Sequence, residues 1–282
     1  MRRFEGRNAI VTGASRGIGA ATSERLAAEG ANVLLVARTL DQHDHLAGSL
    51  RETAERCRKY GTRIEVLTAD LADAESRAQV VPAALDAFAG RVDVLVNNAA
   101  AAMYALNADF PLKRRRVTFE VNVHAPVDLM QAVLPQMVER GEGWIVNLSS
   151  GSAPLVAGPP FDLPPAARTI GVYGASKAAL NRLTNAFAAE FFGAGIRINT
   201  VEPRAAVLSE GAEVLVGEHL SADQIESMEA MVEAIVALCC CERARTGGVL
   251  ESLALLDELG ATVMTLDATR PYPGGQRPVR AD

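Results

Sequence analysis

Tyr173 and Lys177 are the residues whose types and spacing first suggest a reaction. They stand four positions apart at the start of a helical pattern, so both side chains are expected on one face of a helix. A free tyrosine has a pKa of about 10, which is too high for efficient proton transfer at neutral pH. Because a neighbouring cation favours the phenolate and lowers that pKa, the pair indicates proton transfer at a substrate oxygen.

A glycine-rich turn lies near the start of the chain. Residues 12–19 read Thr-Gly-Ala-Ser-Arg-Gly-Ile-Gly and join an apolar run, 8–12, to a helical pattern, 20–29. Glycines allow a tight turn on which a pyrophosphate can lie, and the following helix N-terminus favours the negative charge. A turn of this kind between a first strand and a first helix predicts a dinucleotide site.

Arg38 directly follows the second apolar run, at the place where the adenosine ribose of a dinucleotide is expected. An acid there would bind the two ribose hydroxyls of NAD, whereas an arginine accepts a 2′-phosphate. The first acid after Arg38 is Asp41, and Arg16 in the glycine turn can approach the same phosphate. We therefore predict NADP(H) as the cofactor. An ordinary surface role for Arg38 is the alternative.

The elements that must position these residues alternate along the chain. Long helical patterns, among them Lys113–Glu139 and Val172–Phe192, separate short apolar runs without polar alternation, as in strands buried on both faces. This order predicts a single α/β domain with a doubly wound parallel sheet of the Rossmann type and helices on both faces. The predicted strands are Asn8–Thr12, Asn32–Ala37, Arg63–Thr68, Val92–Val96, Trp144–Leu148 and Ile196–Val201.

The regular order breaks in the second half of the chain. The prolines of 154–170 predict an irregular loop, and 203–220 is expected to form a helical flap. Ser221, with Gln224 closing a capping box, predicts a helix through Cys240. We expect the Rossmann-type domain to span 1–269 and the tail, 270–282, to be extended or disordered.

Composition and charge limit the partners and the compartment. The net charge of −6 offers no global basic field for nucleic acid or an anionic membrane, and we read the basic run 113–116 as a solvated helix surface. No apolar stretch is long enough for a membrane helix, and the N-terminus leaves no room for a signal peptide. The consecutive cysteines 239–241 lack metal-ligand spacing, and His43 and His45 read as surface residues. We therefore expect no metal and a cytoplasmic location.

Taken together, the motifs resemble the short-chain dehydrogenase/reductase family, from about Arg7 to Pro203. The resemblance rests on the glycine turn, Asn97-Asn98-Ala99 after a strand, Asn122, the Ser149-Ser150 pair, Tyr173 with Lys177, and Asn199 with Pro203. It implies that Tyr173 exchanges a proton with the substrate oxygen, while Lys177 lowers the pKa of Tyr173 and binds the nicotinamide ribose. It also implies that Ser150 holds the substrate oxygen and that Asn122 fixes a water. The expected cofactor-binding residues are Gly13, Ser15, Arg16, Gly17, Ile18, Gly19, Arg38, Asp70, Leu71, Asn97, Ala99, Tyr173, Lys177 and Pro203.

The sequence departs from the family pattern in three places. Ser150 and Tyr173 are 23 positions apart, farther than in typical relatives, which predicts an enlarged lip over the substrate entrance. The usual glycine after Pro203 is Arg204, and Leu208 and Ser209 stand where relatives have a threonine for the nicotinamide amide. These changes concern cofactor orientation and substrate contacts and leave the four expected catalytic groups in place.

The resemblance and the residues together predict an NADP(H)-dependent oxidoreductase that interconverts a secondary alcohol and a ketone. A hydrophobic substrate is expected, such as a 3-oxoacyl thioester, a steroid or a polyketide. Two alternatives stay open: a non-catalytic regulator that senses NADP(H), and an epimerase or lyase that recycles its cofactor. The family also implies a homodimer or homotetramer packed through the helices that start near Lys113 and Val172. The expected pocket walls are Leu155, Val156, Phe161, Val207, Leu208 and Leu215.

Overall fold

Seven parallel strands form the central sheet of the computed structural model, which describes residues 2–41, 47–208 and 225–278. The strand order is β3-β2-β1-β4-β5-β6-β9, so the chain first moves outward from β1 and then returns to its other side at β4. Ligands of open parallel sheets bind at such a reversal, beyond the carboxyl ends of the strands. The strands are β1 (Asn8–Thr12), β2 (Asn32–Ala37), β3 (Ile64–Thr68), β4 (Val94–Asn97), β5 (Gly143–Leu148), β6 (Ile196–Glu202) and β9 (Val249–Glu251).

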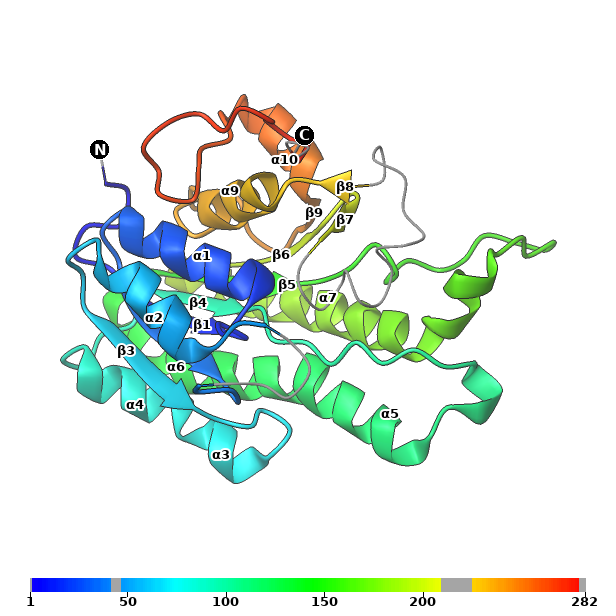
Figure 1. Ribbon diagram of the computed structural model, residues 1–282. Coiled ribbons are helices and arrows are strands. Elements are labelled where there is room, and N and C mark those ends of the chain that lie inside the picture. The colour runs from blue at the N-terminus through cyan, green and yellow to red at the C-terminus, as the bar shows by residue number, and fades with distance from the viewer. Residues whose placement is uncertain (1, 42–46, 209–224, 279–282) are drawn as a thin grey trace.

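Helices cover both faces of this sheet (Figure 1). One face carries α1 (Gly17–Ala28), α2 (Leu50–Arg58), α9 (Met228–Leu238) and α10 (Ser252–Leu259). The other carries α3 (Ala74–Ala78), α4 (Val80–Ala87), α5 (Leu112–Phe119), α6 (Ala125–Arg140) and α7 (Gly171–Phe191). Two buried apolar clusters, one on each face, explain why β1, β4 and β5 show no polar alternation. The predicted doubly wound fold with one domain is confirmed.

Three elements differ from the expectation. The helical pattern 113–139 divides into α5, a π-helical turn at Glu120–His124 and α6. The helix expected from Ser221 begins at Met228, because Ser227 caps it by accepting a hydrogen bond from the Ala230 amide at 3.1 Å. Ser221 and Gln224 lie outside the described residues, as does most of the expected flap. The edge strand β9 was not predicted.

Residues 270–278, expected to be extended or disordered, fold back onto the domain. Pro271 forms an antiparallel bridge with Met264, and the Gln276 carbonyl oxygen accepts a hydrogen bond from the Ser227 amide at 3.0 Å. The side chain of Gln276 also donates to Asp257 at 2.7 Å. Prolines and glycines support tight turns as well as extended chain, and here they make turns against α9 and α10.

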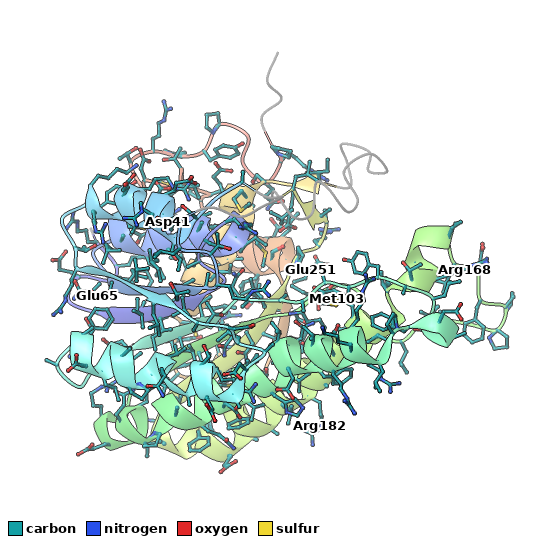
Figure 2. All side chains as sticks on the ribbon, turned by 60° about the horizontal axis from the view of Figure 1, so that its bottom comes forward. Asp41, Glu65, Met103, Arg168, Arg182 and Glu251 are labelled. Carbon is teal, nitrogen blue, oxygen red and sulfur yellow. The ribbon has the colours of Figure 1, made fainter. Side chains whose placement is uncertain are left out.

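Two segments, 101–112 and 151–170, project together beyond the carboxyl edge of the sheet (Figure 1). The amide of Ala105 donates to the carbonyl oxygen of Thr169 at 3.0 Å and joins them. Figure 2 shows Arg168 at the far end of this projection, with Met103 nearer the body of the molecule. The second segment is irregular, as its prolines predicted, apart from a short 3-10 helix at Pro165–Thr169.

Candidate active site

A cavity of about 760 Å³ opens at the carboxyl ends of the strands, where β1 and β4 diverge. It extends from Arg38, after β2, to Tyr173 on α7. Of the predicted site residues, those that line it are Gly13, Ser15, Arg16, Gly17, Ile18, Arg38, Asp70, Leu71, Ala99, Ser150, Tyr173, Lys177 and Pro203. The structure thus brings the expected dinucleotide and proton-transfer residues to one cavity.

Hydrogen bonds between β1 and β4 fix the glycine turn. The side-chain amide of Asn98 donates to the carbonyl oxygen of Thr12 at 2.8 Å, and the Thr12 hydroxyl accepts from the amides of Asn98 and Ala99 at 3.0 and 3.1 Å. A Cβ atom on Gly13, whose φ is +67°, would stand 2.7 Å from Asn98 Nδ2. Gly13 therefore lets two chain segments meet at the floor of the cavity.

Two arginines provide positive charge at the adenosine end. Arg16 Nη2 donates to the Gly48 carbonyl oxygen at 3.2 Å, while its Nε is buried with no hydrogen-bond partner among the described residues. The helix α1 begins directly after Arg16 without a side-chain cap. Arg38 is exposed at the rim of the cavity. A buried unpartnered guanidinium nitrogen beside a helix N-terminus fits the phosphates of a dinucleotide.

Close packing of α7 against the loop after β5 brings Tyr173 near Ser150. A Cβ atom on Gly174 would collide with the carbonyl oxygen of Ser152, so this approach requires glycine. The Ser150 hydroxyl accepts a hydrogen bond from the Ser152 amide at 3.2 Å, and this bond fixes the Ser150 side chain within the loop after β5. The first turn of α7 and the loop after β5 thus form one end of the cavity, which Ser150 and Tyr173 line together.

Burial dominates the electrostatics of the tyrosine and the lysine. Burial raises the pKa of Tyr173, the nearby Tyr104 raises it further, and the interaction with Ser150 lowers it. Lys177 is 2% exposed, its Nζ donates to the Leu148 carbonyl oxygen at 2.7 Å, and burial lowers its pKa to about 8. We expected Lys177 to lower the pKa of Tyr173. In the structure the ammonium is directed to the Leu148 carbonyl oxygen, and burial sets the direction of the pKa shift of both groups.

Asn122 lies in the π-helical turn and is fully buried. Its Oδ1 accepts from the Ala101 amide at 2.8 Å, and its Nδ2 donates to the Ala101 carbonyl oxygen at 3.3 Å and to Ser176 Oγ at 2.9 Å. These bonds fix the side chain of Asn122 within the protein, and its expected contact with a water stays a prediction. Asn122 does not line the cavity. Its hydrogen bonds connect Ala101, in the segment after β4, with Ser176 on α7.

Two other predicted residues also lie behind the cavity wall. Gly19 packs under the glycine turn, where a Cβ atom would meet the Gly13 carbonyl oxygen and Asn98. The side chain of Asn97 points into the sheet, where its Nδ2 donates to Asn147 Oδ1 at 2.8 Å. The neighbouring Asn98 lines the cavity instead. Reading the end of β4 one residue later would have identified it.

The predicted apolar walls need correction. Val207 lines the cavity, but Leu155, Val156, Phe161 and Leu208 do not. Leu155 is 99% exposed and Phe161 64%, because the projecting segment carries them away from the sheet. Met103 and Tyr104 line the cavity in their place, and the rings of Tyr104 and Tyr173 meet edge to face at 5.9 Å. Leu215 and Ser209 lie outside the described residues.

Across 2–41, 47–208 and 225–278, no group of three or more acidic, histidine or cysteine side chains is arranged to hold a metal ion. In those same ranges, no helix is both long enough and apolar enough to cross a membrane.

The chain is similar to proteins of one known family. The family model described as "short chain dehydrogenase" matches residues 7–214. A 1,6-dihydroxycyclohexa-2,4-diene-1-carboxylate dehydrogenase of Pseudomonas putida is 35% identical over 204 residues, which cover 72% of this chain and 67% of that protein. Hydroxysteroid dehydrogenase-like protein 2 of Mus musculus is 29% identical over 275 residues, which cover 95% of this chain. The chain spans about half of that relative, 53% of its length.

Solved structures agree with these matches. A short chain dehydrogenase from Mycobacterium thermoresistibile superposes with a TM-score of 0.79 at 28% identity, covering 98% of this chain and 95% of that one. A 3-oxoacyl (acyl-carrier-protein) reductase from Agrobacterium tumefaciens with NADP bound gives 0.73 at 28% identity, over 88% and 93% of the two chains.

Proposed function

The chain belongs to the short-chain dehydrogenase family, and from this premise we propose that it is an NADP(H)-dependent oxidoreductase. It interconverts a secondary alcohol and a ketone on a hydrophobic substrate. The observation that carries the proposal is one cavity lined at one end by the glycine turn with Arg16 and Arg38, and at the other by Ser150, Tyr173 and Lys177.

The cofactor assignment depends on the arginine pair. Arg38 supplies a charge-assisted partner for the 2′-phosphate of NADP(H), and the unpartnered Nε of Arg16 supplies a second. The bound cofactor gives or takes a hydride, and the protein contributes position and charge. Among similar structures, the reductase from Agrobacterium tumefaciens is described with NADP bound and a short chain dehydrogenase from Mycobacterium paratuberculosis with NAD.

Proton transfer falls to Tyr173. Its hydroxyl gives a proton to the carbonyl oxygen during reduction and takes it back during oxidation. Without substrate, the Ser150 hydroxyl interacts with Tyr173 and opposes the effect of burial on its pKa. With substrate bound, the same hydroxyl proton is donated to the substrate oxygen instead. Lys177 binds the nicotinamide ribose and holds positive charge below its pKa of about 8.

The substrate end of the cavity has apolar walls. Met103, Tyr104 and Val207 lie there, and the charged lining residues are Arg16, Arg38, Asp70 and Lys177, which the proposal assigns to the cofactor. A ketone on a steroid, a polyketide or a 3-oxoacyl chain suits such walls because its apolar surface leaves water. Two similar proteins, a hydroxysteroid dehydrogenase-like protein and a 3-oxoacyl (acyl-carrier-protein) reductase, support this range.

A fluorescence titration of the purified protein with NADPH and, separately, with NADH tests the proposal, followed by turnover assays on apolar ketones. We expect tighter binding of NADPH and its oxidation by at least one ketone. Tighter binding of NADH would refute the NADP(H) assignment, and binding of neither would refute the oxidoreductase. NADPH binding without turnover would indicate a sensor, and product without net oxidation an epimerase or lyase.

We also propose a homodimer or homotetramer that packs through α5 and α7, in the cytoplasm. Light scattering after size-exclusion chromatography measures the mass. A monomer at micromolar concentration would contradict the assembly.

A further inference from the structure

Glu226 ends the short strand β8 (Ile225–Glu226) and carries a carboxylate that is 1% exposed. One carboxylate oxygen, Oε2, accepts hydrogen bonds from two consecutive backbone amides, Arg204 at 3.0 Å and Ala205 at 3.2 Å. The Ser252 hydroxyl, at the start of α10, lies 2.9 Å from both carboxylate oxygens. One acidic side chain thus joins three chain segments.

The two amides lie directly after Pro203, where a strand ladder no longer supplies acceptors. A buried amide without an acceptor costs free energy, and a carboxylate is a stronger acceptor than a neutral group. Glu226 therefore takes the place of secondary structure for this backbone. Its position more than twenty residues later means that the sequence alone does not indicate the contact.

This backbone forms part of the cavity wall. Pro203, Ala206 and Val207 line the cavity, and Val207 pairs with Glu226 in the parallel ladder between β7 (Ala206–Val207) and β8. The wall belongs to the catalytic end, because the Ser149 amide, next to Ser150, donates to the Val201 carbonyl oxygen at 2.8 Å. The carboxylate itself stays behind the wall and does not line the cavity.

We propose that Glu226 is a positioning residue: it fixes the backbone of 203–207 as the wall against which the nicotinamide half of the dinucleotide rests. The inference rests on the proposed function, since it needs a dinucleotide in the cavity. In this chain Arg204 stands where the family has a glycine after Pro203, and we infer that the Glu226 carboxylate behind the wall holds this backbone so that the nicotinamide is oriented.

Glu226→Gln is the test variant, because it keeps the size of the side chain and removes its charge. Glu251→Gln is the matched control: its side chain forms a half-exposed ion pair with Arg204 Nε at 3.5 Å, and among the described residues the two amides donate to Glu226 and not to Glu251. Each variant is titrated with NADPH and with adenosine 2′,5′-bisphosphate, which carries the 2′-phosphate and no nicotinamide. Thermal melting checks that each variant is folded.

For Glu226→Gln we expect NADPH to bind about five- to tenfold more weakly, as charge-assisted bonds become neutral ones. The bisphosphate should bind within twofold of the wild type, and Glu251→Gln should bind both ligands normally. Equal weakening of both ligands, or unchanged NADPH binding in Glu226→Gln, would overturn the positioning role. If Glu226→Gln does not fold, Ser252→Ala is measured instead, because the Ser252 hydroxyl donates to Glu226 and also accepts from the Arg204 amide at 3.2 Å. The same selective loss is expected. A wild type that binds neither ligand would refute the proposed function instead.

Discussion

The ammonium nitrogen of Lys177 lies 5.8 Å from the centre of the Tyr173 ring, while its hydrogen bond goes to the Leu148 carbonyl oxygen. Burial shifts the pKa of Tyr173 upward and that of Lys177 downward, to about 8. The site therefore disfavours the phenolate of Tyr173 and the ammonium of Lys177 relative to water.

The pH dependence of stability should report the buried lysine. Its pKa is about 8 in the folded protein and about 10.5 when unfolded, so between these values the unfolded chain binds a proton that the folded chain does not. The free energy of unfolding should therefore rise with pH across this window, by roughly 3 kcal/mol from this residue. Urea unfolding without cofactor, at pH 7.5, 9 and 10.5, measures it.

Lys177→Met is the control for that experiment, since cysteines and tyrosines titrate in the same range. The wild-type free energy of unfolding minus that of the variant should increase with pH. Parallel curves for the two proteins would show that Lys177 stays charged when buried.

Tyr173→Phe should reduce kcat at least a hundredfold, because a positioned acid contributes about 10²–10⁴-fold to the rate. The dissociation constant for NADPH should change less than twofold. Steady-state kinetics and titration measure the two effects. Tyr104→Phe, which keeps the aromatic contact with the Tyr173 ring at 5.9 Å, serves as control and should lose less than fivefold. Comparable losses in the two variants would contradict a unique role for the Tyr173 hydroxyl.

Gly174→Ala should separate Tyr173 from Ser150. Its Cβ atom would collide with the Ser152 carbonyl oxygen, and a backbone atom can move away only by shifting the serine loop. We expect kcat/KM to fall at least tenfold and the stability to drop by about 1–3 kcal/mol. Gly193→Ala is the matched control, since its Cβ atom would meet nothing within 4 Å. Full activity in Gly174→Ala would show that the loop can move freely.

Arg38→Asp should weaken NADPH binding on the order of 2 kcal/mol more than NADH binding, because it replaces a phosphate partner by a like charge. Fluorescence titration with both cofactors gives the difference. Arg182→Asp is the control, because Arg182 lies on α7 and does not line the cavity, and Figure 2 shows it apart from the lining residue Met103. An equal effect of Arg38→Asp on both cofactors would remove Arg38 from the phosphate site.

The sequence predicted the elements whose signal is local. The runs 8–12 and 32–37 match β1 and β2, because continuous apolar residues mark strands covered on both faces. β9 was missed since it has three residues and none is fully buried. The π-helical turn around Asn122 was missed because its residues continue the helical pattern and only the hydrogen bonds differ.

Site residues that directly follow the end of a strand or the start of a helix could be predicted from the sequence. Arg38 and Tyr173 follow such ends and starts directly, and both line the cavity. The choice between Asn97 and Asn98 depends on the residue at which β4 ends. The direction of the Leu155 side chain depends on an irregular loop, in which no helical or strand periodicity predicts which side chains face the protein. The contact of Glu226 with the Arg204 amide joins distant segments, which no local pattern encodes.

The two projecting segments, 101–112 and 151–170, are less constrained in sequence than the glycine turn. Leu155 and Phe161 are exposed and belong to neither buried cluster, and the Ala105 amide of one segment donates a hydrogen bond to the Thr169 carbonyl oxygen of the other. Replacing 154–170 therefore costs little core packing, whereas the Thr12–Asn98 contacts tolerate no comparable exchange. The projection can therefore change in sequence more freely than the contacts that hold the glycine turn.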